Sequence, residues 1–207
     1  DEKNRLVYEY IRIIYELEPT FILMENVPGM SNGIGKMIFK KVVKFLQELY
    51  YIEYGTLNAA DYGVPQTRKR LVLHGIRKDI YKIIVSKNNN FPITLLPQPT
   101  HSQIKKIGCK KWITVGDSIS DLPAIGAGEI CENSEIKNHI ARRLSQTNIE
   151  RLQEIRDNGG NKARISEYLQ LECHKKKNVS YTDTYGIIDS SKPAPTITSG
   201  CTIISKG

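Results

Sequence analysis

The sequence predicts an α/β fold in which part of a parallel sheet precedes a smaller mixed domain. Helical and extended patterns alternate along the first part of the chain, which is typical of a parallel sheet. The apolar run at 21–24 is short and is closed by a polar pair and a Pro-Gly breaker, as expected of a central strand. The composition shifts towards Asn and Pro near 87–92. Because such shifts mark linkers, we expect one domain at 1–92 and a second at 93–207.

Apolar periodicity gives the individual elements of the first domain. One apolar face runs from Leu6 to Leu17 and stops before Pro19, which predicts a helix. A similar pattern over 37–49 predicts a second helix with lysines on its solvent side. The remaining expected elements are strands at 21–27, 51–58 and 69–77, a short helix after 115 with Asp117 or Ser118 as its N-cap, and a broad helical region at 140–155.

Charged side chains stand at the ends of the predicted strands. Glu25 is placed at the carboxyl end of its strand, where open α/β sheets bind ligands. Arg68 and Arg70 precede another apolar stretch, and their alternate spacing puts both side chains on one face. A carboxylate and two guanidinium groups in one pocket would recognise a ligand with both an acceptor and a negative or carbonyl edge.

Three blocks of the sequence resemble the DNA cytosine-C5 methyltransferases. Residues 25–27 look like the Glu-Asn-Val motif of that family, and 57–70 look like its Asn-Ala-x-Asp-Tyr-Gly-x-Pro-Gln-x-Arg-x-Arg block. Residues 192–200 resemble the Pro-Ala-Pro-Thr-Ile-Thr segment that follows the target-recognition region. The resemblance extends over nearly the whole chain and is weakest between about 100 and 180. It implies the C-terminal part of a Rossmann-like methyltransferase sheet followed by a target-recognition domain.

The resemblance also implies a reaction and roles for site residues. The family flips a cytosine out of double-stranded DNA and transfers a methyl group from S-adenosylmethionine to C5. Glu25 would bind the ring N3 and the exocyclic amine in its protonated form, which burial favours. Arg70 is expected to reach the base O2, and Arg68 to brace Glu25 or the DNA backbone. Asn26 and Gln66 are expected to be structural at the site.

The formal net charge of +8 favours a polyanionic partner, here double-stranded DNA. The expected contacts to the DNA backbone are the lysine run Lys175, Lys176 and Lys177 and the hydroxyl groups of Thr196 and Thr198. Each has a simpler interpretation, because lysine runs are often solvated loops and a proline-rich segment can be a plain connection.

Two parts of the family's chemistry are not found in the sequence. The family uses a cysteine nucleophile in a Pro-Cys motif and a Gly-rich loop for S-adenosylmethionine, but no cysteine here follows a proline and no Phe-x-Gly-x-Gly stretch occurs. We therefore expect this chain to be inactive alone, with both parts supplied by a missing N-terminal segment or a complementary subunit. The first strands of the sheet would then be missing too, which leaves a long unpaired edge.

Cysteine spacing and hydropathy argue against a disulfide framework, a structural metal site and a membrane segment. The four cysteines lack the paired short spacings of a disulfide framework or a structural zinc site, so no metal is expected. No apolar run approaches the roughly 20 residues that span a bilayer, and no basic-then-apolar leader opens the chain, so a cytoplasmic protein without membrane contact is expected. Trp112 is expected to anchor the small domain.

The leading hypothesis is part of a methyltransferase from a restriction-modification system. A catalytically inactive, sequence-specific DNA-binding remnant is the main alternative, because it would need only the basic region at 93–207. An unrelated α/β enzyme with Glu25 as general base remains possible only if the block at 57–70 is a coincidence.

Overall fold

The computed structural model describes residues 5–33, 35–88, 93–133, 135–175 and 185–197. The chain divides into two compact units, Asp1–Trp112 and Ile113–Gly207. Each unit is described by itself. Among the described helices, none is long and apolar enough to cross a membrane.

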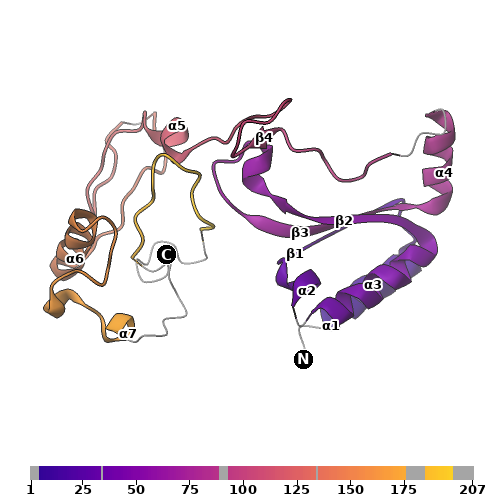
Figure 1. Ribbon diagram of the computed structural model, residues 1–207, viewed down its shortest axis with the longest axis horizontal. Coiled ribbons are helices and arrows are strands. Elements are labelled where there is room, and N and C mark those ends of the chain that lie inside the picture. Colours follow the sequence, from indigo (N-terminus) through magenta and orange to yellow (C-terminus); the bar gives the residue numbers. More distant parts are fainter. Residues whose placement is uncertain (1–4, 34, 89–92, 134, 176–184, 198–207) are drawn as a thin grey trace. The chain divides into compact units, whose positions relative to one another are not determined.

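The first unit contains the helices and strands that apolar periodicity predicts there (Figure 1). Both predicted helices and all three predicted strands are confirmed, with ends shifted by a few residues at most. The elements are α1 (Arg5–Leu17), β1 (Phe21–Asn26), α2 (Gly29–Asn32), α3 (Lys36–Leu49), β2 (Tyr50–Asn58), the 3-10 helix η2 (Ala59–Tyr62), β3 (Lys69–Arg77), α4 (Lys78–Lys87), β4 (His101–Ser102) and β5 (Lys110–Lys111).

The main sheet has the order β1-β3-β2, and β3 is antiparallel to both neighbours. The expectation of a parallel sheet with β1 at its centre is therefore wrong for the described strands. Residues 59–68 form a connection short enough to return β3 beside β2 in the opposite direction, whereas parallel neighbours need a longer crossover. β1 and β2 point the same way without pairing, and β1 lies at an edge.

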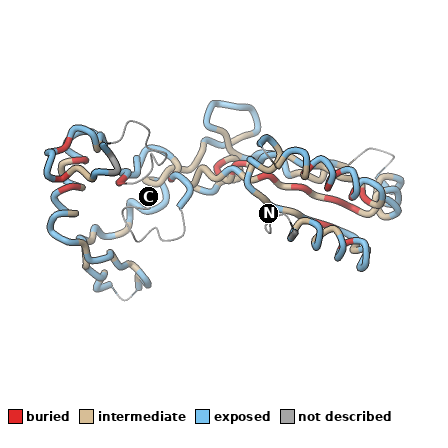
Figure 2. The backbone as a smooth tube through the Cα atoms, turned by 90° about the horizontal axis from the view of Figure 1, so that it is seen from below, coloured by how far each residue is buried: buried red, intermediate tan, exposed pale blue. Residues whose placement is uncertain are grey.

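One face of this sheet is covered by α1 and α3, as Figure 1 shows. The strands alternate, so β1, β2 and β3 each send every second side chain to this face. Figure 2 shows the buried residues of the unit concentrated in these strands and the helices over them. The buried core consists of Ile14, Ile22, Phe39, Val42, Val43, Leu46, Tyr50, Leu71 and Leu73.

Gly75 on β3 leaves room for side chains from the two neighbouring strands. It pairs with Ile22 of β1 on one side and with Ile52 of β2 on the other. A Cβ atom at Gly75 would lie 2.5 Å from Cγ1 of Ile22 and 2.7 Å from Cδ1 of Ile52. We therefore expect Gly75→Ala to lower the free energy of unfolding by about 1–3 kcal/mol, the usual cost of overpacking, in urea denaturation of this chain.

Gly29→Ala is the matched control for that substitution. Gly29 lies in α2, and a Cβ atom there would lie more than 4 Å from every atom beyond its chain neighbours and its own helix backbone, so the added methyl group would not be crowded. Equal unfolding midpoints for both variants would contradict the packing explanation of Gly75.

Residues 93–112 belong to the first unit, whereas the domain boundary was expected at 92. The carboxylate of Glu53 on β2 accepts hydrogen bonds from the backbone N–H of Leu95 (2.8 Å) and Leu96 (3.2 Å). Further along, Nε1 of Trp112 donates to Oδ1 of Asp61 at 2.9 Å. The expectation that Trp112 anchors the small domain is therefore wrong, since its indole is fixed to η2 of the first unit.

The second unit contains α5 (Val115–Ile119), α6 (Gln146–Asp157), η3 (Glu167–Leu169) and α7 (Glu172–Lys175). Its small core consists of Ile155, Ile165, Leu169 and Tyr185. The N-cap of α5 is Thr114, so the expected cap at Asp117 or Ser118 is wrong. Asp117 occupies the third helical position instead, and it completes a capping box with the backbone N–H of Thr114.

The proline segment near the C-terminus packs against the start of α5. The backbone N–H of Val115 donates to the carbonyl of Lys192 at 2.9 Å, and that of Gly116 donates to Ser190 at 2.8 Å. Ala194 is buried. These contacts place the segment within the second unit.

Candidate active site

The register of β1 and β3 brings Glu25 and Arg70 together. Glu25 is paired with Val72, and Arg70 lies two residues before Val72 on the same face of the sheet. This is the diagonal position that long side chains can reach across neighbouring strands. Nε of Arg70 lies 2.8 Å from Oε1 of Glu25. The structure thus gives Arg70 the contact with Glu25 that the sequence analysis assigned to Arg68.

The Glu25–Arg70 pair is held at its arginine end. Nη1 of Arg70 also donates to the carbonyl of Lys69 at 2.8 Å, so the guanidinium group is fixed between a carboxylate and a backbone oxygen. The side chain of Arg70 is 23% exposed. A planar, multidentate donor of this kind orients a carboxylate better than a point charge does.

Glu25 itself is not buried in this chain, contrary to the expectation from its apolar surroundings in sequence. Its side chain is 55% exposed. Phe21 and Leu23 share its face of β1 and are 64% and 60% exposed. Among the described residues, no element covers this face of β1, and β1 is also an edge strand. An apolar run alone therefore does not make a strand central.

Asn26 ends β1 and supports the turn that follows. Its Oδ1 accepts a hydrogen bond from the N–H of Val27 at 2.8 Å. Asn side chains commonly stabilise turns through such contacts with nearby backbone groups. The chain then enters α2 at Gly29.

Arg68 lies one residue before β3, and its backbone is fixed by Asn58 at the end of β2. The N–H of Arg68 donates to Oδ1 of Asn58 at 3.0 Å, and its carbonyl accepts from the N–H of Ala59 at 3.0 Å. The side chain of Asn58 is buried. Sequence reasoning did not select Asn58, although it opens the Asn-Ala-x-Asp-Tyr-Gly block. Gln66 lies in the same turn, where its N–H donates to the carbonyl of Val64 at 2.7 Å.

The expected DNA-binding residues belong to the second unit. Nζ of Lys175 lies 2.8 Å from a carboxylate oxygen of Glu172 and 3.9 Å from one of Glu167. The hydrogen bond to Glu172 raises the pKa of Lys175, so this side chain stays charged. Thr196 is exposed. The predictions for Lys176, Lys177 and Thr198 lie outside the described residues.

No group of three or more His, Cys, Asp or Glu side chains within the described ranges could hold a metal ion. The Glu25–Arg70 pair offers a carboxyl group that can hydrogen-bond a ligand and a cationic donor that orients this carboxyl group.

Comparisons with known proteins agree with the motifs on these strands. The family model of C-5 cytosine-specific DNA methylases matches residues 1–203. The Type II methylase M.HgiDII of Herpetosiphon aurantiacus is 34% identical over 201 residues, which is 96% of this chain and 51% of that protein. The Type II methyltransferase M1.HphI of Haemophilus parahaemolyticus is 32% identical over 200 residues, with 96% of this chain and 45% of that protein covered.

A solved structure shares the fold. It is a prophage-encoded protein of E. coli described as a DNA modification methyltransferase, with a TM-score of 0.52 and 21% sequence identity. The match covers 95% of this chain and 58% of that one. The mixed α/β fold is thus found in a methyltransferase structure. This chain spans about half the length of the curated relatives described above. Since the family model covers nearly all of its residues, the chain belongs to the C-5 cytosine-specific DNA methylase family.

Proposed function

We propose that this chain is part of a DNA (cytosine-5-)-methyltransferase that flips a target cytosine and methylates its C5 in a restriction-modification system. The observation that carries the proposal is the Glu25–Arg70 ion pair at the ends of β1 and β3. Both residues belong to sequence blocks of the family, and the relatives described above are Type II enzymes. S-adenosylmethionine would supply the methyl group.

In this proposal Glu25 acts on the cytosine ring. Its carboxyl group binds N3 and the exocyclic amine, and a proton held on Glu25 stabilises the ring when a cysteine thiolate adds at C6 and makes C5 electron-rich. Arg70 orients the carboxyl group, which its present contact with Glu25 supports. Arg68, whose backbone is fixed beside β3, is then the guanidinium left for the base O2 or the DNA backbone.

The cysteine nucleophile and the cofactor loop are proposed to come from a segment outside this chain or from a complementary subunit. No cysteine of the sequence follows a proline. In the part of the chain that the structure describes, one edge of β1 is unpaired and Phe21 and Leu23 are exposed, which supports the idea because a further strand and its covering elements would bury them. The same covering would desolvate Glu25. The chain alone is then inactive.

The target-recognition domain was expected at 93–207, and we propose that the second unit, 113–207, is its main part. Lys175, Lys176 and Lys177 and the hydroxyl groups of Thr196 and Thr198 are the proposed contacts to the phosphates of double-stranded DNA. The ion pairs of Lys175 are exposed and contribute little energy, so a phosphate could replace their carboxylates.

Methyl transfer tests the proposed function. Labelled S-adenosylmethionine and mixed-sequence double-stranded DNA are incubated with this chain alone, and then with the chain joined to a family segment carrying the Pro-Cys motif and the cofactor loop. We expect label at C5 of cytosine only in the second case. Transfer by the chain alone would refute the proposed division of the active site. Sequence-specific footprints without transfer in either case would instead indicate a DNA-binding remnant.

A further inference from the structure

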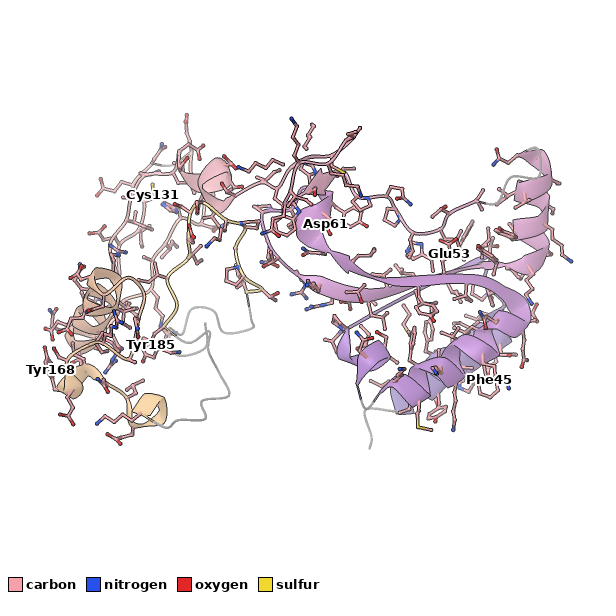
Figure 3. All side chains as sticks on the ribbon, in the orientation of Figure 1. Phe45, Glu53, Asp61, Cys131, Tyr168 and Tyr185 are labelled. Atoms are coloured by element: carbon pink, nitrogen blue, oxygen red, sulfur yellow. The ribbon has the colours of Figure 1, made fainter. Side chains whose placement is uncertain are left out.

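The turn that carries Arg68 is held from outside by the segment at 97–112. Three hydrogen bonds join this segment to two consecutive residues of η2, Asp61 and Tyr62. The hydroxyl group of Tyr62 donates to the carbonyl of Pro97 at 3.0 Å, and the N–H of Thr100 donates to the carbonyl of Asp61 at 2.9 Å. Nε1 of Trp112 donates to Oδ1 of Asp61 at 2.9 Å. Figure 3 labels Asp61 on η2, beside this segment.

The segment also packs tightly against the turn. Gly63 has a φ of +87°, and a Cβ atom there would lie 2.9 Å from Cε1 of His101. The parallel pairing of β4 with β5 returns the chain towards the turn, since His101 pairs with Lys110. The indole of Trp112 follows directly after β5. The outer side of the turn is thus closed by residues that are distant from it in sequence.

The inner side of the same turn is tied to Arg68. The carbonyl of Ala59 accepts from the N–H of Val64 at 3.2 Å, and the N–H of Ala59 donates to Arg68 at 3.0 Å. Asn58 accepts from the N–H of Arg68 at 3.0 Å. These hydrogen bonds join the two ends of the turn, so η2 at its start is linked to Arg68 at its end, just before β3. Moving η2 would move Arg68.

We propose that Asp61 and Trp112 are positioning residues, whose hydrogen bond fixes the turn and so sets the position of Arg68 for catalysis. The proposal rests on the function proposed above for Arg68. Trp112 is followed by Ile113, the first residue of the second unit, so the same bond fixes the point from which the chain leaves the first unit.

A positioning role differs from a structural one in the relative size of two effects of a substitution, that on the reaction rate and that on the free energy of folding. One intramolecular hydrogen bond contributes only a small part of the free energy of folding. A shift of about 1 Å in a group that positions a substrate can lower the reaction rate by as much as about 100-fold. Removing the Trp112 donor should therefore slow the reaction well before it unfolds the unit.

The test compares variants in the complete enzyme, with kcat and the Kd for DNA measured separately. We expect Trp112→Phe and Asp61→Ala each to lower kcat by about 10-fold at unchanged Kd. Asp61→Asn keeps an acceptor oxygen at the same place, so it should retain most of the activity. The double variant Asp61→Ala/Trp112→Phe should be no slower than either single variant, because each substitution removes the same hydrogen bond.

Glu53→Ala is the control for loosening the residues directly before this segment. It removes the acceptor for Leu95 and Leu96 but leaves the contacts of η2 intact, so kcat should not change. The proposal is overturned if Asp61→Asn is as slow as Asp61→Ala, if the single effects add in the double variant, or if only the Kd changes.

A second measurement does not depend on activity. In hydrogen–deuterium exchange of this chain, Trp112→Phe should speed exchange of the amide of Arg68 and of residues 59–64, whereas Glu53→Ala should not. Unchanged exchange at Arg68 would overturn the positioning role even if the complete enzyme proved inactive. A complete wild-type enzyme without methyl transfer would instead refute the proposed function.

Discussion

We expect Glu25→Gln in the complete enzyme to lower kcat by about 1,000-fold while the Kd for DNA stays within about two-fold. A loss of this size is typical when a group that stabilises charge in the transition state loses its proton-carrying ability. Gln keeps the shape of the side chain and can still accept from Arg70, so the pocket should remain formed. Single-turnover methylation and DNA-binding titrations measure the two quantities.

The matched control for Glu25→Gln is Glu16→Gln on α1. Glu16 is an exposed carboxylate that is ion-paired with Arg12 on the same helix and lies on neither β1 nor β3. The substitution Glu16→Gln should leave both kcat and the Kd for DNA unchanged. Unchanged turnover in Glu25→Gln would exclude the proposed role, and an equal loss of DNA affinity would mean that Glu25 contributes to binding alone.

Arg70→Ala is expected to lower kcat by about 100-fold, which corresponds to about 2.7 kcal/mol of lost transition-state stabilisation. The reason is that Glu25 would lose the donor at 2.8 Å that orients it. Arg70→Lys keeps the charge but not the planar group, so its kcat should lie between those of the wild type and of Arg70→Ala. The measurement is single-turnover methylation at saturating DNA.

Two comparisons decide whether Arg70 acts through Glu25. Lys69→Ala changes the neighbouring exposed residue, whose side chain is on the other face of β3, and should have no effect. In the double variant Glu25→Gln/Arg70→Ala the losses in kcat should not add, because both substitutions disturb the same ion pair. Fully additive losses would show that Arg70 works independently of Glu25.

The helices α1 and α3 and the strands β1, β2 and β3 were predictable because apolar periodicity is a local property of the sequence, whereas α4 and the shorter elements of the first unit were not predicted. The pairing of the strands was not predictable. The run from Phe21 to Met24 looks like a buried central strand, yet Phe21 and Leu23 are exposed on an edge. Hydropathy reports which side chains prefer burial, but which neighbour covers them depends on the tertiary arrangement.

The site was predictable in its residues and not in its contacts. Sequence motifs selected Glu25, Arg68 and Arg70, but the partner of Glu25 follows from the register of β1 against β3, which the motifs do not contain. The amide of Asn58 and the indole of Trp112 were overlooked as supports for the turn before β3. Such hydrogen bonds join groups that are distant in sequence, so spacing gives no signal for the Asp61–Trp112 pair.

The central position of β3 also determines the order in which the sheet can assemble. Pairing β3 with β2 closes only the connection at 59–68, whereas pairing β3 with β1 closes a loop that contains α2, α3 and β2. The longer loop loses more chain entropy on closure, and contacts between distant segments form more slowly. Of these three strands, β1 comes first in the sequence and is the last to be joined. Glu25 meets Arg70 only in that final step, so this ion pair exists only after the three strands have paired.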